Sequence, residues 1–162
     1  MQQKFQFELF ADYFQFYLQD ESVKGDLSES WTQEAVDRLL ATAPGTVGVG
    51  TVRNTIVPVV VEIGDAAPED DIGEWDQVNE CTLEAPSGRV VIAGCTDYLP
   101  DAARIELPPG AYRARIYYGQ LNAVSPDGLK GDDHYKIVLW GAAPGPVRVL
   151  KHRGQSSSQA RA

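Results

Sequence analysis

Short stretches of alternating apolar and polar residues recur along this chain, separated by turns rich in glycine and proline. A two-residue period is typical of a strand with one buried face, so we expect a mainly β protein. The parity of the alternation changes near Ala11 and Asp12, which predicts a bend that keeps Phe5 and Phe14 facing inward on either side of it. The predicted strands comprise residues 5–9, 14–18, 46–52, 56–63, 77–84, 89–94, 103–107, 111–118 and 135–140.

One segment, about residues 31–42, carries apolar residues at helical spacing. Ser30 and Gln33 form a capping-box pattern at its start, and Pro44 followed by Gly45 marks its end. Many short strands with one main α-helix predict an antiparallel β-sandwich with the helix packed at one side or end.

Two tight turns, at residues 85–88 and 107–111, predict local β-hairpins. In the first hairpin Cys81 would lie opposite Ile92, and Cys95 would lie beyond the pair and point to the other face. We therefore expect both cysteines to be free thiols.

The charge is distributed unevenly along the chain. Residues 1–144 contain all 23 acidic residues against 10 Lys and Arg, whereas the stretch from Gly145 holds four bases and no acid. We expect one sandwich domain over residues 1–144 and a flexible basic tail over 145–162. An acidic body repels phosphate backbones and attracts basic protein surfaces, which excludes direct nucleic-acid binding and favours a basic protein partner.

The chain lacks an apolar run long enough to span a membrane, and its first residues do not form a secretory signal pattern. These observations predict a cytoplasmic protein. They leave the oligomeric state open.

Residues 62–76 hold seven carboxylates and no base. Such a run usually forms a solvated surface, but it could also imitate a nucleic-acid backbone and occupy the basic cleft of a nuclease. In the second case Trp75 would be an aromatic anchor beside a steering patch, and in the first it would be partly buried under the acidic residues. The predicted partner-binding residues are Asp70, Asp71, Glu74, Trp75 and Asp76.

The stretch 119–134 is longer than a hairpin needs and carries Asp127, Asp132, Asp133 and His134. These side chains could form a polar or cation site, and a metal-dependent hydrolase would use Asp132, Asp133 and His134. The alternative is a turn in which the Asp side chains accept backbone N–H bonds and His134 begins the next strand. A nucleophile motif is absent from the sequence, and we expect no cofactor.

Three arginines of the chain bear on its surface chemistry. Arg53 could bind an anion or a partner carboxylate, or could pair with an acidic side chain of its own chain. Arg113 and Arg115 are expected on the solvent face of their strand, with Glu106 as a cross-strand partner.

Four segments of the chain form a recognisable series: Leu9 to Asp20 with its spaced aromatic residues, Trp31-Thr-Gln-Glu-Ala35, Gly48-Val-Gly-Thr-Val-Arg-Asn54, and Leu107-Pro-Pro-Gly-Ala-Tyr-Arg113. This series resembles the competence protein J family, the DNA-entry nuclease inhibitors, over about residues 5–141. The resemblance implies a small β-rich protein that binds a secreted or membrane-associated nuclease and blocks it without catalysis. Three functions therefore remain open: a non-enzymatic acidic inhibitor or immunity-type protein, a metal-dependent hydrolase, and a structural or ligand-binding sandwich module.

Overall fold

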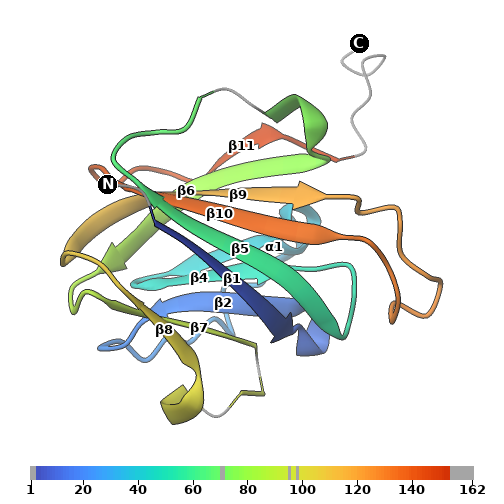
Figure 1. Cartoon of the computed structure of the whole chain (residues 1–162), viewed down its shortest axis with the longest axis horizontal. Coiled ribbons are helices and arrows are strands. Elements are labelled where there is room, and N and C mark those ends of the chain that lie inside the picture. The colour runs from blue at the N-terminus through green and yellow to red at the C-terminus, as the bar shows by residue number, and fades with distance from the viewer. Residues whose placement is uncertain (1–2, 70–71, 95, 98, 154–162) are drawn as a thin grey trace.

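Two β-sheets packed face to face form the protein (Figure 1). The computed structural model describes residues 3–69, 72–94, 96–97 and 99–153. In the described part, neighbouring strands are antiparallel except β5 and β10, which run parallel. Sheet A has the order β1 (Gln3–Phe10), β5 (Ile56–Gly64), β10 (His134–Gly141), β9 (Gly110–Gly119), β6 (Gln77–Ala85) and β11 (Arg148–Lys151). Sheet B has the order β3 (Leu40–Ala43), β4 (Thr46–Gly50), β2 (Gln15–Asp20), β7 (Arg89–Gly94) and β8 (Ala103–Glu106). The predicted β-sandwich is confirmed.

The core lies between the sheets and follows the alternation read from the sequence. Phe16 of β2, Tyr118 of β9 and Tyr135 of β10 are almost fully buried there, and Tyr135 packs edge-on against the other two rings at 5.9 Å between centroids. Cys81 is a free thiol in the same core, and burial raises its pKa to about 12. Cys95 lies outside the described residues.

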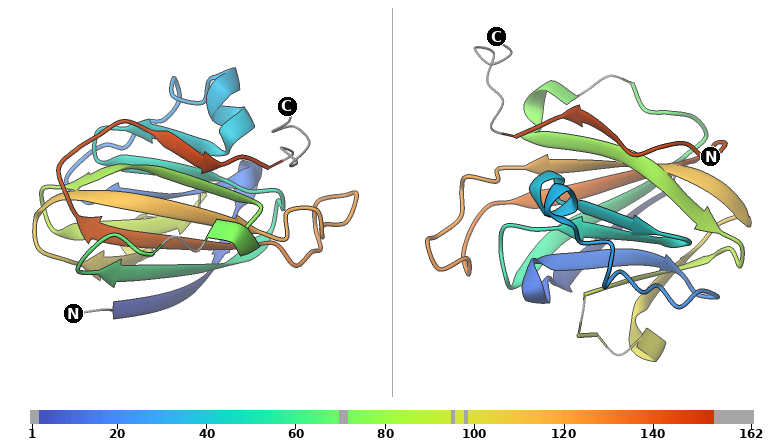
Figure 2. Two further views of the ribbon diagram at one scale, coloured as in Figure 1. Left: turned by 90° about the horizontal axis from the view of Figure 1, so that it is seen from above. Right: turned by 180° about the vertical axis from the view of Figure 1, so that it is seen from behind.

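The helix α1 (Gln33–Arg38) is shorter than predicted and covers part of the outer face of sheet B (Figure 2). Thr32, rather than Ser30, caps it by accepting the Ala35 N–H at 3.2 Å. Leu39 then adopts a left-handed conformation with φ of +62°, which ends the helix, so the residues that follow begin β3. The backbone reversal, which the apolar spacing does not encode, separates a six-residue helix from a strand.

Side chains of sheet A donate hydrogen bonds to the backbone carbonyls at the end of α1. Asn79 donates an amide N–H to the Arg38 carbonyl at 2.7 Å, and the Tyr118 hydroxyl donates to the Leu39 carbonyl. Burial is the main cause of the raised pKa of Tyr118, which keeps this hydroxyl a donor. Helix and sheet are thus joined across the interior by hydrogen bonds.

Both predicted hairpins are wrong, because each turn carries the chain from one sheet to the other. Residues 85–88 join β6 of sheet A to β7 of sheet B, and residues 107–109 join β8 of sheet B to β9 of sheet A. The two turns lie side by side, with the Leu107 N–H donating to the Gly88 carbonyl at 2.9 Å. Cys81 is consequently opposite Ala114, not Ile92.

The flexible tail predicted from residue 145 is wrong for residues 145–153. Arg113 donates to the carbonyls of Gly145 and Pro146 at 2.9 Å, and β11 then pairs with β6 at the edge of sheet A. The acid-free stretch therefore completes the sheet instead of leaving it. Residues 154–162 lie outside the described part.

Among the residues that the structure describes, we find no helix with the length and apolarity needed to cross a membrane.

Candidate partner-binding surfaces

The acidic segment comprises residues 62–76, of which 62–69 and 72–76 are described. It begins within β5, and on the outer face of sheet A it reaches β6 through the short 3₁₀ helix η2 (Ile72–Glu74) (Figure 1). Apolar contacts fasten its end to the sheet. Ile72 and Trp75 pack against a buried outer cluster of Val78, Tyr117, Val138 and Trp140. Of the predicted partner-binding residues, Asp70 and Asp71 lie outside the described residues.

Trp75 is half-buried, and its ring centroid lies 5.2 Å from those of Tyr117 and His134. Gly119 leaves room for both rings, since a β-carbon at that position would come within 2.5 Å of the His134 imidazole and 3.1 Å of the Trp75 indole. Trp75 is therefore partly buried and holds the end of the acidic segment against sheet A.

Some carboxylates of the acidic segment are already engaged within the protein. Asp76 accepts the Leu121 N–H at 2.7 Å, and Glu62 lies 3.7 Å from the ammonium of Lys136. Glu69 and Glu74 are exposed. The seven formal charges thus exceed the number available to a partner.

Beneath the acidic segment, Arg113 and Arg115 are largely covered, with side chains 9% and 12% exposed. Both guanidinium groups flank Glu80, at 3.8 and 3.7 Å. Arg115 also donates to the Pro68 carbonyl at 3.4 Å and lies over the Trp140 ring. The prediction of a solvated arginine face is wrong because the acidic segment and the returning C-terminal stretch cover it, and Glu106 approaches Arg89 instead.

A surface pocket of about 580 Å³ lies between the start of the acidic segment and sheet A. Charged and apolar groups both line it, among them Lys4, Glu62, Ile63, Glu69 and Val138. This pocket differs from the closed apolar cavity that a carrier of apolar ligands needs.

The loop 119–134 does not bring its acidic residues together. Asp127 accepts bonds from the Ser125 hydroxyl and the Leu129 N–H, and the Ser125 bond is the main reason that the Asp127 pKa lies below its ordinary value. Asp132 is exposed, and His134 Nδ1 lies 3.1 Å from the Asp132 carbonyl. The described residues contain no group of three or more His, Cys, Asp or Glu placed to hold one metal ion. The geometry therefore does not assemble the cation site that a metal-dependent hydrolase requires.

Asp133 is fully buried and is paired with Arg53, whose Nε donates to its Oδ1 at 2.7 Å. The Tyr135 hydroxyl donates to the other carboxylate oxygen at 2.6 Å and accepts the Val52 N–H at 3.0 Å. Burial, with the carboxylate beside it, raises the Tyr135 pKa. Arg53 is thus an internal ion-pair partner that joins the turn after β4 to the base of the loop 119–134.

The sequence interpretation missed an exposed apolar surface at one end of the sandwich, here called the aromatic tip. It consists of Phe10, Tyr13, Phe14, Ile56 and Leu129, which are 42%, 69%, 44%, 51% and 50% exposed. The alternation placed Phe14 inward with Phe16, whereas the 3₁₀ turn η1 (Asp12–Phe14) turns it outward. The signal available in the sequence was the presence of aromatic residues next to the change of parity.

The backbone of the aromatic tip is unusual at two consecutive positions. Tyr13 and Phe14 have φ of +61° and +60°. This left-handed region costs a non-glycine residue roughly 1–2 kcal/mol, and aromatic side chains are rare in it.

Together, the two sheet orders and the short helix α1 of the described residues define a class, the two-sheet β-sandwich. No protein-family model matches the chain, and no curated protein matches its sequence. Two solved structures share the fold.

One of the two is ComJ from Bacillus subtilis, described as the inhibitor of the DNA degrading activity of NucA. It has a TM-score of 0.70 and 17% sequence identity, over 88% of this chain and 99% of that one. The other is described as Crocagin biosynthetic gene J, with a TM-score of 0.63 and 20% identity over the same shares. The predicted resemblance to the competence protein J family is confirmed in the fold.

Proposed function

We propose that this protein binds a basic nuclease and inhibits it. The observation that carries the proposal is the similarity to ComJ, which covers 88% of this chain and almost all of that inhibitor. The alignment thus extends over nearly the whole fold of that inhibitor.

The charge of the chain supports the same function. A nuclease attracts DNA with a positive channel, and a protein with a formal net charge of −9 has the sign needed to approach that channel. We infer that Asp70, Asp71 and Glu74 contribute to this attraction. Asp76 and Trp75 contribute less directly, because they hold the acidic segment in place.

The test is inhibition of DNA degradation by purified nucleases. Each DNA-degrading nuclease of the same genome, and NucA as an additional probe, is mixed with increasing amounts of the full chain at low and at physiological salt. We expect at least one to be blocked near equimolar chain, with weaker inhibition as salt screens the attraction. No slowing of any nuclease at low salt, with micromolar chain, would overturn the proposal.

A DNA mobility-shift assay with the chain alone is the control. We expect the DNA to migrate unchanged, because an acidic surface repels phosphate. A shift would mean that the chain protects DNA by covering it, which contradicts inhibition through the nuclease.

A further inference from the structure

We infer that the aromatic tip is the surface that contacts the basic protein partner, and that it supplies more of the affinity than the acidic segment. This inference rests on the proposed function and adds the location of the contact. Of the seven large apolar side chains exposed in the described part, five belong to the tip; the other two are Val36 and Val149.

Hydrogen bonds and strand pairing make the tip one continuous surface. Phe10 lies opposite Ile56 in the pairing of β1 with β5. The Tyr13 N–H donates to the Asn54 side chain at 2.9 Å, and the Asn54 N–H donates to the Gly128 carbonyl at 2.8 Å. Gly128 in turn lies against the Phe14 ring, since a β-carbon there would come within 3.5 Å of it.

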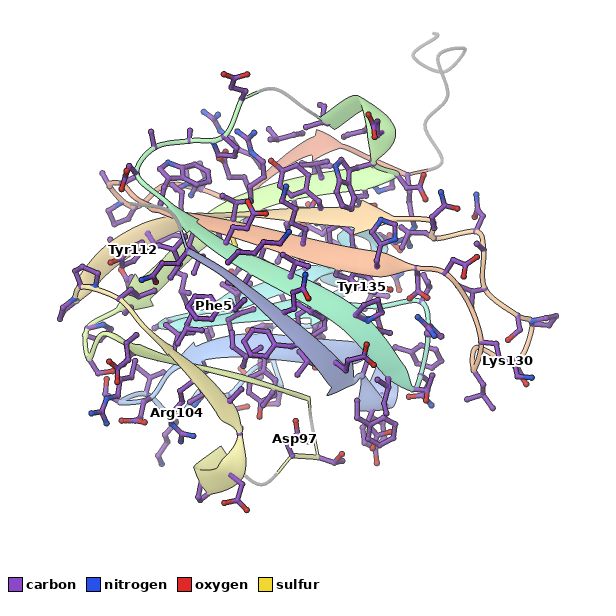
Figure 3. The ribbon with its side chains drawn as sticks, viewed as in Figure 1. Phe5, Asp97, Arg104, Tyr112, Lys130 and Tyr135 are labelled. Carbon is purple, nitrogen blue, oxygen red and sulfur yellow. The ribbon has the colours of Figure 1, made fainter. Side chains whose placement is uncertain are left out.

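The tip is formed by the end of β1 with η1, the start of β5, and the loop 119–134. These three segments lie at the same end of the sandwich in all views (Figures 1 and 2). Figure 3 shows Lys130 at the outer end of the loop 119–134 and Tyr135 within the sheet behind it. The buried Arg53–Asp133 pair anchors the adjoining turn. The exposed rings are therefore held in position before any partner arrives, which reduces the entropy lost on binding.

The left-handed backbone at Tyr13 and Phe14 supports the same inference. Asn or Gly would adopt this conformation with less strain, and a small polar residue would expose less apolar surface. The chain instead carries two aromatic rings there, exposed by 69% and 44%. Strain and exposed apolar area both oppose stability, so the arrangement is explained by a contact outside the chain.

The charges around the tip fit a basic partner. Glu8 and Asp127 are exposed, Asp12 is half-buried next to Tyr13, and Lys130 is the exposed base on the same loop, while Arg53 is neutralised by Asp133. An aromatic centre with an acidic rim suits a protein surface that carries Lys or Arg around an apolar contact. A second copy of this chain would bring two acidic rims together, which disfavours self-association through the tip.

The experiment compares binding and folding for Tyr13→Asn and Phe14→Asn. Asn tolerates the left-handed region, so we expect each variant to unfold at the same temperature as the wild type or at a higher one. Affinity for the nuclease identified by the inhibition assay, measured by calorimetry, should fall about 10- to 100-fold, as for aromatic residues at the centre of an interface. Val36→Gln, which removes an exposed apolar residue on α1, should leave the affinity unchanged.

The outcomes separate this inference from the proposed function. If the wild type inhibits a nuclease and both Asn variants bind it as tightly as the wild type, the tip is not the contact and the proposed function stands. If the wild type inhibits none, both fail. Light scattering gives the oligomeric state, and a dimer that Tyr13→Asn converts to a monomer would assign the tip to a second copy and overturn the inference.

Discussion

The acidic segment and the aromatic tip are the two surfaces that we propose for contact with a partner, and they differ in how far each is free for it. The acidic segment is conspicuous in the sequence, yet Glu62 lies near Lys136 and Asp76 bonds to the Leu121 backbone. The tip is inconspicuous in the sequence, yet Tyr13 and Phe14 leave much of their rings exposed. Formal charge and available surface are therefore separate quantities.

The difference has a physical origin. A carboxylate near an N–H or an ammonium group gains a hydrogen bond or ion pair within the folded chain. Some carboxylates of an acidic run are therefore already engaged inside the protein. An aromatic ring that a constrained backbone turns outward leaves apolar area in contact with water. The first kind of surface supplies long-range attraction, and the second supplies area that association can bury.

The largest expected effect concerns the support of the tip. Arg53→Met leaves the Asp133 carboxylate buried without its ion-pair partner, so the free energy of unfolding should fall by about 3–5 kcal/mol. Urea denaturation measures the change. Arg89→Met is the control, because Arg89 is 56% exposed and its pairs with Glu21 and Glu106 should contribute no more than about 1 kcal/mol. Equal losses in both variants would contradict a rigidly supported tip.

The attachment of the acidic segment gives the next largest effect. Trp75→Ala removes the ring that contacts Tyr117 and His134, and the free energy of unfolding should fall by about 2–3 kcal/mol, less than for a fully buried tryptophan. The neighbouring Glu74→Ala, at an exposed position, should change it by no more than about 0.5 kcal/mol. A Trp75 variant as stable as the wild type would show that the segment is not fastened to sheet A.

Binding kinetics should separate the two surfaces directly. Neutralising Glu69 and Glu74 together, as Glu69→Gln and Glu74→Gln, should slow association with the nuclease about two- to fivefold at low salt and little at high salt, because screening removes steering. Tyr13→Asn should act mainly on dissociation. Glu29→Gln with Glu34→Gln makes the same change of net charge near α1 and should have a smaller effect on association. Surface plasmon resonance at two salt concentrations distinguishes these results; a dominant effect of the acidic segment on dissociation would reverse the comparison.

The smallest effect is a titration within the loop that borders the tip. Asp127 should titrate in NMR below the ordinary aspartate value of about 3.9, chiefly because the Ser125 hydroxyl donates to its carboxylate, and Ser125→Ala should raise its midpoint toward that value. A carboxyl group whose pKa is lower in the folded than in the unfolded chain stabilises the fold at pH values above its unfolded-state pKa. This contribution is lost as the pH falls through its folded-state pKa. Acidification should therefore loosen residues 125–130. An unchanged midpoint in Ser125→Ala would exclude the serine as the cause.

Much of the strand content was predictable because a strand with one buried face records its orientation in local alternation. Tyr112, Ala114, Ile116 and Tyr118 face the core as predicted, and the parity change near Ala11 does mark a bend. The candidate site was predicted less well. Arg53 was correctly considered as an internal pair partner, but its partner Asp133 is 80 positions away, and local pattern carries no information at that distance.

The sequence by itself determined the β class, the approximate strands, the acidic character and the presence of a main α-helix, because each depends on neighbouring residues or on composition. Only the tertiary structure decided that residues 85–88 and 107–109 cross between sheets, that residues 145–153 return to cover Arg113, and that Tyr13 and Phe14 face outward. A tight turn and an alternating strand satisfy their local requirements in either sheet. The choice is made by the pairing and burial that the complete sandwich allows.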